Sequence, residues 1–301
     1  MKLHYSIAGT TVIDGVRDIV GDYDVFLLDV CGVIYDQATV FEGAIEAVEM
    51  LQAQGKVVLF VGNMPVSRQG LVDRIKQFRM KIDDQYLWTG GEVFLRELRA
   101  GRVPGWKDGL KVYFNERRSF WDDLVQASPS VQRVDSIQEA EMLLLLSETQ
   151  VGDPEHVMDT LLEEAAAFGV PMLCINPDLW AIKGPDAIVH TPGTWAKRYQ
   201  QMGGSVLASY GKPHANIYDY VLAHLREEGF VDRERMIMVG DTMYTDIEGA
   251  AKAGIHSLWI LHGSHRDRVL DEQGAIDFNG MAEVVGEYGR VPNWTMQAFR
   301  W

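Results

Sequence analysis

Short apolar segments of strand length alternate with segments of helical pattern along most of this sequence. Residues 25–29, 57–61 and 236–239 consist almost entirely of Val, Leu, Ile, Phe and Met, and each run ends in, or is followed by, Gly or Asp. Strands without a polar face indicate a parallel sheet buried on both sides, because the connecting helices cover it. Residues 206–209 and 255–261 have the same pattern. We therefore predict an α/β fold with a doubly wound parallel sheet.

The middle of the chain has a strand and helix rhythm of its own, with apolar runs at residues 111–114, 142–146 and 171–175. A length of 301 residues allows about two domains of roughly 150 residues each. We expect the middle block to be a separate small α/β layer, with hinges in the Gly- and Pro-containing turns at residues 89–91 and 183–185. The predicted division is 1–83 for the first part of the core, 84–187 for the inserted domain and 188–301 for the second part of the core.

The charge balance and the cysteine content limit which binding partners and which cellular compartment the sequence predicts. The chain has 28 Lys and Arg against 43 Asp and Glu, a formal net charge of −15. Nucleic acids and anionic membranes recruit basic faces, so we expect neither as a partner. No apolar run approaches the ~20 residues that a membrane span requires. With only two cysteines there is no disulfide framework, which predicts a cytoplasmic location.

Polar residues follow two of the apolar runs, where ligands bind in folds of this class. Asp29 closes the run at 25–29, and the segment 240–246 (Gly-Asp-Thr-Met-Tyr-Thr-Asp) supplies Asp241 and Asp246. Carboxylates from neighbouring strand ends form a hard oxygen site suited to Mg²⁺. Lys212 lies in a Gly-Lys-Pro turn that opens a predicted helix. A lysine beside a helix N-terminus indicates an anion site.

Together and in this order, three segments resemble motifs of the haloacid dehalogenase (HAD) superfamily of aspartyl-phosphate phosphohydrolases. They are residues 26–36 (Phe-Leu-Leu-Asp-Val-Cys-Gly-Val-Ile-Tyr-Asp), 211–213 and 240–246. The position of the middle block resembles subfamily IIA, in which an inserted α/β cap domain covers the site of a Rossmann-like core. Further matches to that subfamily are Gly62-Asn63, Asn176-Pro-Asp178 and Pro192-Gly193.

The resemblance implies a role for each motif residue. Asp29 would attack phosphorus, and Lys212 would stabilise the phosphoryl oxygens and hold Asp29 in place. Mg²⁺ would be held by Asp29, the backbone carbonyl of Cys31 and Asp241, with Asp246 supporting that shell. The phosphate-binding groups implied by the motifs are Gly62, Asn63 and Lys212.

The sequence departs from the family pattern at two positions. Cys31 stands where the family has a second Asp that protonates the leaving group, and the loss of such acid–base help typically costs ~10²–10⁴ in rate. Gly62 stands where the family has a Thr or Ser that donates to a phosphoryl oxygen, and the loss of one such donor costs ~10²–10³. The backbone N–H groups of Gly62 and Asn63 remain available, and the Asn63 side chain could add a donor.

Three compensations would preserve turnover. The substrate could have an acidic leaving group such as that of an acyl phosphate, or a proton could come from Asp36 in the same loop or from Asp178 in the cap. We predict a Mg²⁺-dependent phosphatase that acts on a small phosphorylated metabolite, and the family resemblance is compatible with a homodimer through the cap. The alternative is a protein that binds Mg²⁺ and a phosphorylated ligand without efficient turnover.

Overall fold

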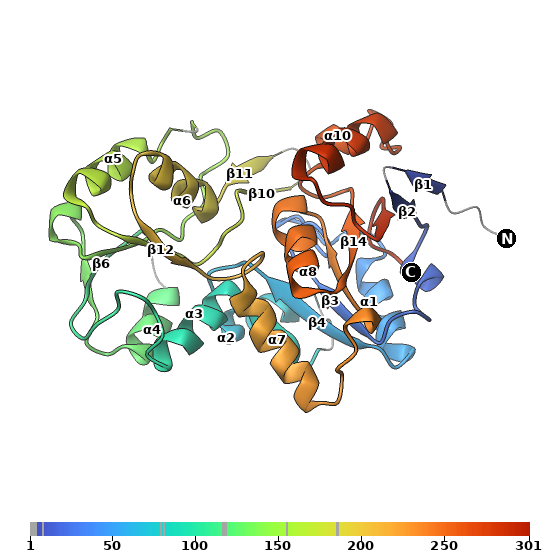
Figure 1. Cartoon of the computed structure of the whole chain (residues 1–301), viewed down its shortest axis with the longest axis horizontal. Helices are drawn as coiled ribbons and strands as arrows, with labels where there is room; N and C mark the ends of the chain where they lie inside the picture. The colour runs from blue at the N-terminus through green and yellow to red at the C-terminus, as the bar shows by residue number, and fades with distance from the viewer. Residues whose placement is uncertain are drawn as a thin grey trace.

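The computed structural model describes residues 5–7, 9–78, 80, 82–115, 119–154, 156–184 and 187–301. Two mostly parallel sheets, each covered by helices, lie side by side, and the C-terminus lies on the side of the larger sheet away from the smaller one (Figure 1). The α/β class predicted from the apolar runs is confirmed. Pro185, in one of the predicted hinges, lies outside the described residues. No helix in the described part of the chain is long and apolar enough to cross a membrane.

The larger sheet has eight strands, and all neighbouring pairs are parallel except β1 and β2. Residues 25–28 form its central strand because every side chain is apolar and fully buried. The strand order is β1 (Tyr5–Ile7), β2 (Thr10–Val12), β15 (Trp294–Met296), β14 (His256–Ile260), β13 (Met236–Gly240), β3 (Val25–Leu28), β4 (Val57–Gly62) and β5 (Leu87–Thr89).

Successive side chains of β3 point to opposite faces of the larger sheet and join different hydrophobic cores. Val25 and Leu27 pack with α3, α7 and α8, whereas Phe26 and Leu28 pack with α1 and α2 on the opposite face. This arrangement is the doubly wound fold that the sequence predicts. The helices are α1 (Ala44–Ala53), α2 (Arg68–Lys76), α3 (Gly90–Arg99), α4 (Ser119–Ala127), α5 (Asp159–Phe168), α6 (Pro192–Gln201), α7 (Ala215–Glu227), α8 (Glu248–Ala253), α9 (Arg266–Val269) and α10 (Phe278–Tyr288).

The smaller sheet has five strands, and all its neighbouring pairs are parallel. One face packs on α3 and α4, and the other packs on α5 and α6. Its order is β12 (Val206–Ser209), β9 (Met172–Cys174), β8 (Met142–Leu144), β6 (Lys111–Phe114) and β7 (Gln132–Val134), and a hairpin of β10 (Trp180–Ile182) and β11 (Ile188–His190) lies between the two sheets (Figure 1).

The cap boundary predicted at 84–187 stays a prediction, because sheet membership alone does not define a domain. Two observations bear on it. Residues 206–209 lie after the predicted cap in the sequence but pair within the smaller sheet. An apolar run does not reveal which sheet it joins, so the sequence did not predict this pairing. The helix α3 contributes to a core that contains side chains of both sheets. At the C-terminus, β15 and the buried Phe299 dock the tail on the larger sheet.

Candidate active site

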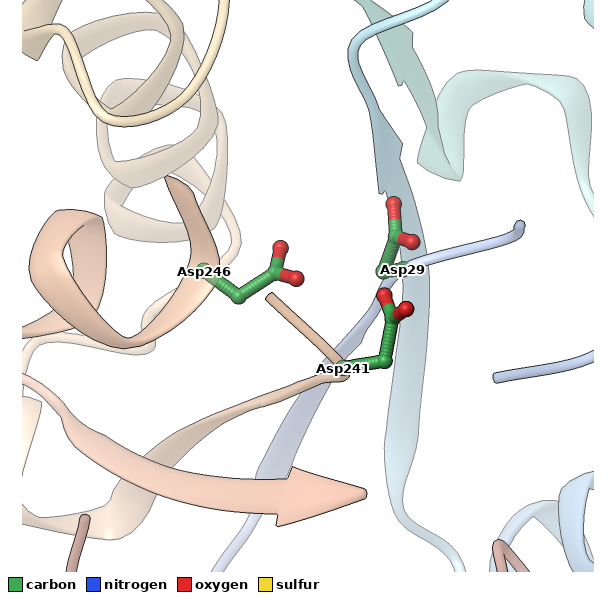
Figure 2. Close-up of side chains that lie close together, drawn as sticks. All are labelled: Asp29, Asp241 and Asp246. Atoms are coloured by element: carbon green, nitrogen blue, oxygen red, sulfur yellow. The ribbon is translucent and has the colours of Figure 1, made fainter. Parts of the chain in front are cut away.

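Three buried carboxylates meet at the carboxyl edge of the larger sheet. Asp29 follows β3, Asp241 follows β13, and Asp246 lies in the π-helical turn η5 (Met243–Ile247). One ligand oxygen of each lies within 4.8 Å of the others. Figure 2 shows the carboxylates of Asp29 and Asp241 close together, with that of Asp246 directed toward them. The structure thus brings together the three acidic residues that the sequence had placed at one edge of the sheet.

Two glycines allow neighbouring loops to close on Asp241. A Cβ atom at Gly32 would lie 2.2 Å from the Asp241 Oδ2 atom, and one at Gly263 would lie 2.2 Å from the Asp241 Cβ atom. Gly32 also has φ of 93°, a backbone conformation that residues with a Cβ atom rarely adopt. Only glycine therefore allows these backbones so close to the carboxylate.

Lys212 connects two of the carboxylates. Its Nζ atom lies 2.6 Å from Asp29 Oδ1 and 2.7 Å from Asp246 Oδ1, and the side chain is 1% exposed. With Asp241 the cluster holds three carboxylates and one ammonium, so full ionisation leaves two negative charges in a largely buried site. Buried oxygen donors with this excess charge fit a divalent hard cation such as Mg²⁺.

Burial and mutual repulsion disfavour ionisation of these carboxylates without a cation. Burial raises the pKa of Asp29 well above its usual range; Lys212 opposes that shift, and Asp246 and Asp241 add to it. Burial, assisted by Asp246, raises the pKa of Asp241 to about 7, although hydrogen bonds from Ser264 act in the opposite direction. A bound cation would relieve this cost, since it favours the ionised form of every ligand.

Asp241 is also fixed by residues that the sequence analysis did not identify. The backbone N and the Oγ of Ser264 each donate to Asp241 Oδ2 at 2.6 Å, and Trp259 Nε1 donates to the Asp241 carbonyl at 3.0 Å. Ser264 lies in the loop after β14, the strand next to β13. Strand-end reasoning extended to this next strand would have found it.

Asn63 uses its side chain to position the lysine loop. Its Oδ1 accepts from Lys212 N at 2.6 Å, while its Nδ2 donates to the Lys212 carbonyl at 2.8 Å and to Asp178 Oδ1 at 2.9 Å. Both amide hydrogens therefore have acceptors within the described residues, and the side-chain phosphate contact expected of Asn63 stays a prediction. Gly62 lies beside Asp29, where an added Cβ atom would be 3.9 Å from Asp29 Oδ1.

The three residues considered around the missing acid have different environments. The Cys31 thiol contacts the Ile182 carbonyl at 3.8 Å, and burial, with Asp241 and Asp29 nearby, raises its pKa well above the usual value. Asp36 accepts from the backbone of Ala38 and Thr39; burial alone would raise its pKa, but these hydrogen bonds lower the pKa overall. Asp178 lines the cavity over Asp29, and burial, offset in part by Lys212, raises its pKa to about 6.

The cavity above Asp29 encloses about 540 Å³, including space open to solvent. Besides the motif residues, its wall includes side chains from α2, from the loop after β3 and from the smaller-sheet layer. The sequence analysis missed these contributors because no strand-end or turn pattern marks them. They include Gln37, Arg74, Glu148 and Trp180, and Tyr35 from the first motif segment lies beside them.

Comparisons with known proteins agree with this geometry. Residues 26–122 match a family model described as haloacid dehalogenase-like hydrolase, and residues 209–283 match a second HAD-hydrolase-like model. Chronophin from Rattus norvegicus is 25% identical over 280 residues, covering 90% of this chain and 86% of chronophin. A HAD-like hydrolase from Brucella suis 1330 superimposes with a TM-score of 0.76 at 24% identity, covering 95% of this chain and 99% of that one. A p-nitrophenyl phosphatase from Archaeoglobus fulgidus gives 0.66 at 22% identity, covering 92% and 97%.

A doubly wound core with a second α/β layer, strand-end carboxylates and a buried lysine is in keeping with the hydrolase class that these comparisons indicate. The two family models together span more than half of the sequence and carry all three motifs. The chain belongs to the haloacid dehalogenase superfamily, and its structural neighbours are phosphatase-like members of subfamily IIA type.

Proposed function

We propose that this protein is a Mg²⁺-dependent phosphohydrolase that acts on a small phosphorylated metabolite through an aspartyl-phosphate. The observation that carries the proposal is the contact of Lys212 Nζ with both Asp29 and Asp246, beside Asp241. A carboxylate held by an ammonium at the floor of a cavity is oriented for attack, and the same ammonium can stabilise phosphoryl oxygens. Several relatives and structural neighbours are named as phosphatases, which supports the same function.

In the first step, an Asp29 carboxylate oxygen forms a bond to phosphorus as the bond to the leaving-group oxygen breaks. Water then hydrolyses the aspartyl-phosphate and regenerates Asp29, with inorganic phosphate as the product. Asp29, the Cys31 carbonyl and Asp241, supported by Asp246, would hold Mg²⁺. When bound, the ion neutralises charge on the nucleophile and the phosphoryl group.

The leaving-group oxygen needs either a proton or intrinsic stability as an anion. Cys31 is a weak donor, so we assign the proton to Asp178, which lines the cavity and whose raised pKa, about 6, keeps part of it protonated near neutral pH. Asp36 is the weaker candidate, because its carboxylate is bound in a turn. A substrate with an acidic leaving group requires neither residue.

A second candidate function is binding of Mg²⁺ and a phosphorylated ligand without efficient turnover. The neutral Cys31 thiol and the missing hydroxyl at Gly62 favour it, because each removes a group that accelerates catalysis. In either case we propose a cytoplasmic protein without a nucleic-acid or membrane partner, and a homodimer through the cap.

The deciding experiment measures phosphate release with and without Mg²⁺ from acetyl phosphate, p-nitrophenyl phosphate, sugar phosphates and nucleotides. Asp29→Asn provides the blank, and Asp241→Asn tests the metal ligand. We expect release that requires Mg²⁺ and is abolished by either substitution. Activity retained in Asp29→Asn would contradict the covalent mechanism, while Mg²⁺ binding without any release would favour the binding function.

A further inference from the structure

Two cationic side chains line the cavity among the residues that the structure describes, Lys212 and Arg74. The charge of Lys212 is already shared between Asp29 and Asp246 at the cavity floor. Arg74 projects from α2 at the wall of the same cavity, and it also lines an adjoining outer pocket together with Lys183. Arg74 therefore lies on the path from the nucleophile to solvent, where the non-reacting part of a substrate must lie.

Arg74 is held in place by direct contacts with uncharged groups. Its Nη1 donates to the Tyr35 hydroxyl at 2.8 Å and contacts Met64 Sδ at 3.5 Å. Tyr35 is in turn packed on Phe78, with ring centroids 5.0 Å apart. Within the described residues no carboxylate forms an ion pair with the half-buried Arg74, and Glu148 on the same wall attracts it only from a longer distance.

A guanidinium has five N–H donors, and in Arg74 only those on Nη1 have a partner among the described residues, so donors remain for an anion that a ligand delivers. The planar fork of Arg matches a carboxylate through two parallel hydrogen bonds. Glu148 on the same wall, which accepts from Gln37 Nε2 at 3.4 Å, adds negative charge nearby. That charge disfavours a second phosphate group more strongly than a single carboxylate.

We propose that Arg74 is a specificity-determining residue that binds a carboxylate on the leaving-group side, so that the preferred substrate is a phosphorylated carboxylic acid. This inference deepens the proposed phosphatase function and rests on it. Tyr35 acts as a positioning residue, because its hydroxyl fixes the guanidinium.

The test compares two substrates that differ only in this charge, meta-carboxyphenyl phosphate and its neutral meta-carbamoyl analogue. We expect the ratio of their kcat/KM values to favour the carboxylate by about 10- to 100-fold, the range for hydrogen bonds to charged groups. Arg74→Gln should bring the ratio close to one, Arg74→Lys should give an intermediate ratio, and Tyr35→Phe should lower it in part. Lys76→Gln removes an exposed charge from the same helix and is the matched control, with an unchanged ratio.

A second arm does not depend on turnover. Calorimetry with Mg²⁺ present measures binding of the corresponding carboxyl and carbamoyl benzylphosphonates, which cannot be hydrolysed. A preference for the carboxyl ligand that Arg74→Gln removes supports the proposal, even if phosphate release fails and the phosphatase function is wrong. Equal affinity for both phosphonates, or a preference that survives Arg74→Gln, overturns it.

Discussion

Cys31 lies two residues after Asp29, beside the same cavity, at the position where HAD phosphatases carry a second aspartate. Its raised pKa keeps it a neutral thiol, so it can neither donate a proton as a carboxylic acid does nor act as a thiolate base. Because Asp178, the donor we propose, is only partly protonated near neutral pH, the rate should still depend on how well the leaving group departs without a proton.

We predict that Cys31→Asp raises the turnover of alkyl phosphates by about 10²-fold or more, because general acid catalysis typically contributes that much. Aryl and acyl phosphates should gain less, since their leaving groups need less protonation. The measurement is kcat/KM across a series of leaving groups of increasing pKa, with Cys31→Ser as a control of similar size. A flat series in the unmodified protein would argue against this account.

Gly62 marks the second departure, and the structure leaves room to reverse it. An added Cβ atom would meet Met64 Cε at 3.6 Å and Val30 Cγ2 at 3.7 Å, both ordinary contacts. We predict that Gly62→Ser folds normally and raises kcat/KM by at least about 10-fold, because it restores a donor near the phosphoryl group. Gly62→Ala adds the carbon without the hydroxyl, and an equal gain in both variants would show that the donor is not the cause.

At the scale of elements, the apolar runs predicted the central strands β3, β4, β13 and β14 to within one residue at each end. They did not predict that β12 pairs with β9, because two parallel sheets produce the same apolar pattern. Strand-end reasoning found Asp29 and Asp241 because backbone topology alone places them together.

Arg74 was not predictable in this way, since it reaches Tyr35, 39 residues earlier in the chain, through a long side chain on a helix. No local pattern encodes such a contact. Polar residues on amphipathic helices usually face solvent, so the helical spacing of α2 gives no reason to expect Arg74 in a cavity.

The start of α3 is a tightly packed junction, although the sequence analysis expected a hinge there. A Cβ atom at Gly90 would lie 2.4 Å from the Ile175 carbonyl oxygen and 2.7 Å from that of Tyr210. Thr89 accepts from Glu92 N at 2.9 Å and so caps the helix. Segments from both sheets therefore meet at this glycine.

We predict that Gly90→Ala lowers the free energy of unfolding by about 1–3 kcal/mol, the usual cost of overpacking. Gly286→Ala is the matched control in the exposed part of α10, where an added Cβ atom meets nothing within 4 Å. That substitution should stabilise by about 0.5–1 kcal/mol through helix propensity. Urea unfolding of the three proteins measures both effects, and a Gly90→Ala protein as stable as the parent would contradict the packing argument.

For the whole molecule, the shared core around α3 joins the two sheets, so the fold around the site should respond as one unit. When no cation is bound, the ionised carboxylate cluster destabilises the folded state. The folded-state pKa values of Asp29 and Asp241 lie above their unfolded values. The stability that these groups contribute is therefore present at low pH and is lost as the pH rises through about 7, the pKa of Asp241.

Mg²⁺ should reverse this trend, because it binds the ionised carboxylates and competes with protons for them. We predict that saturating Mg²⁺ raises Tm more at pH 8 than at pH 6, and that the affinity for Mg²⁺ falls as the pH is lowered through about 7, the pKa of Asp241. At a hundredfold excess over Kd, binding adds about 2.7 kcal/mol. Thermal unfolding with and without Mg²⁺ measures the shift in Tm at each pH.

Two variants serve as controls for this prediction. Asp241→Asn should abolish the Mg²⁺-dependent shift in Tm, whereas Asp219→Asn, an exposed substitution in α7, should retain it. A Mg²⁺ shift that is the same at both pH values would mean that the ion stabilises the protein elsewhere than at these three carboxylates.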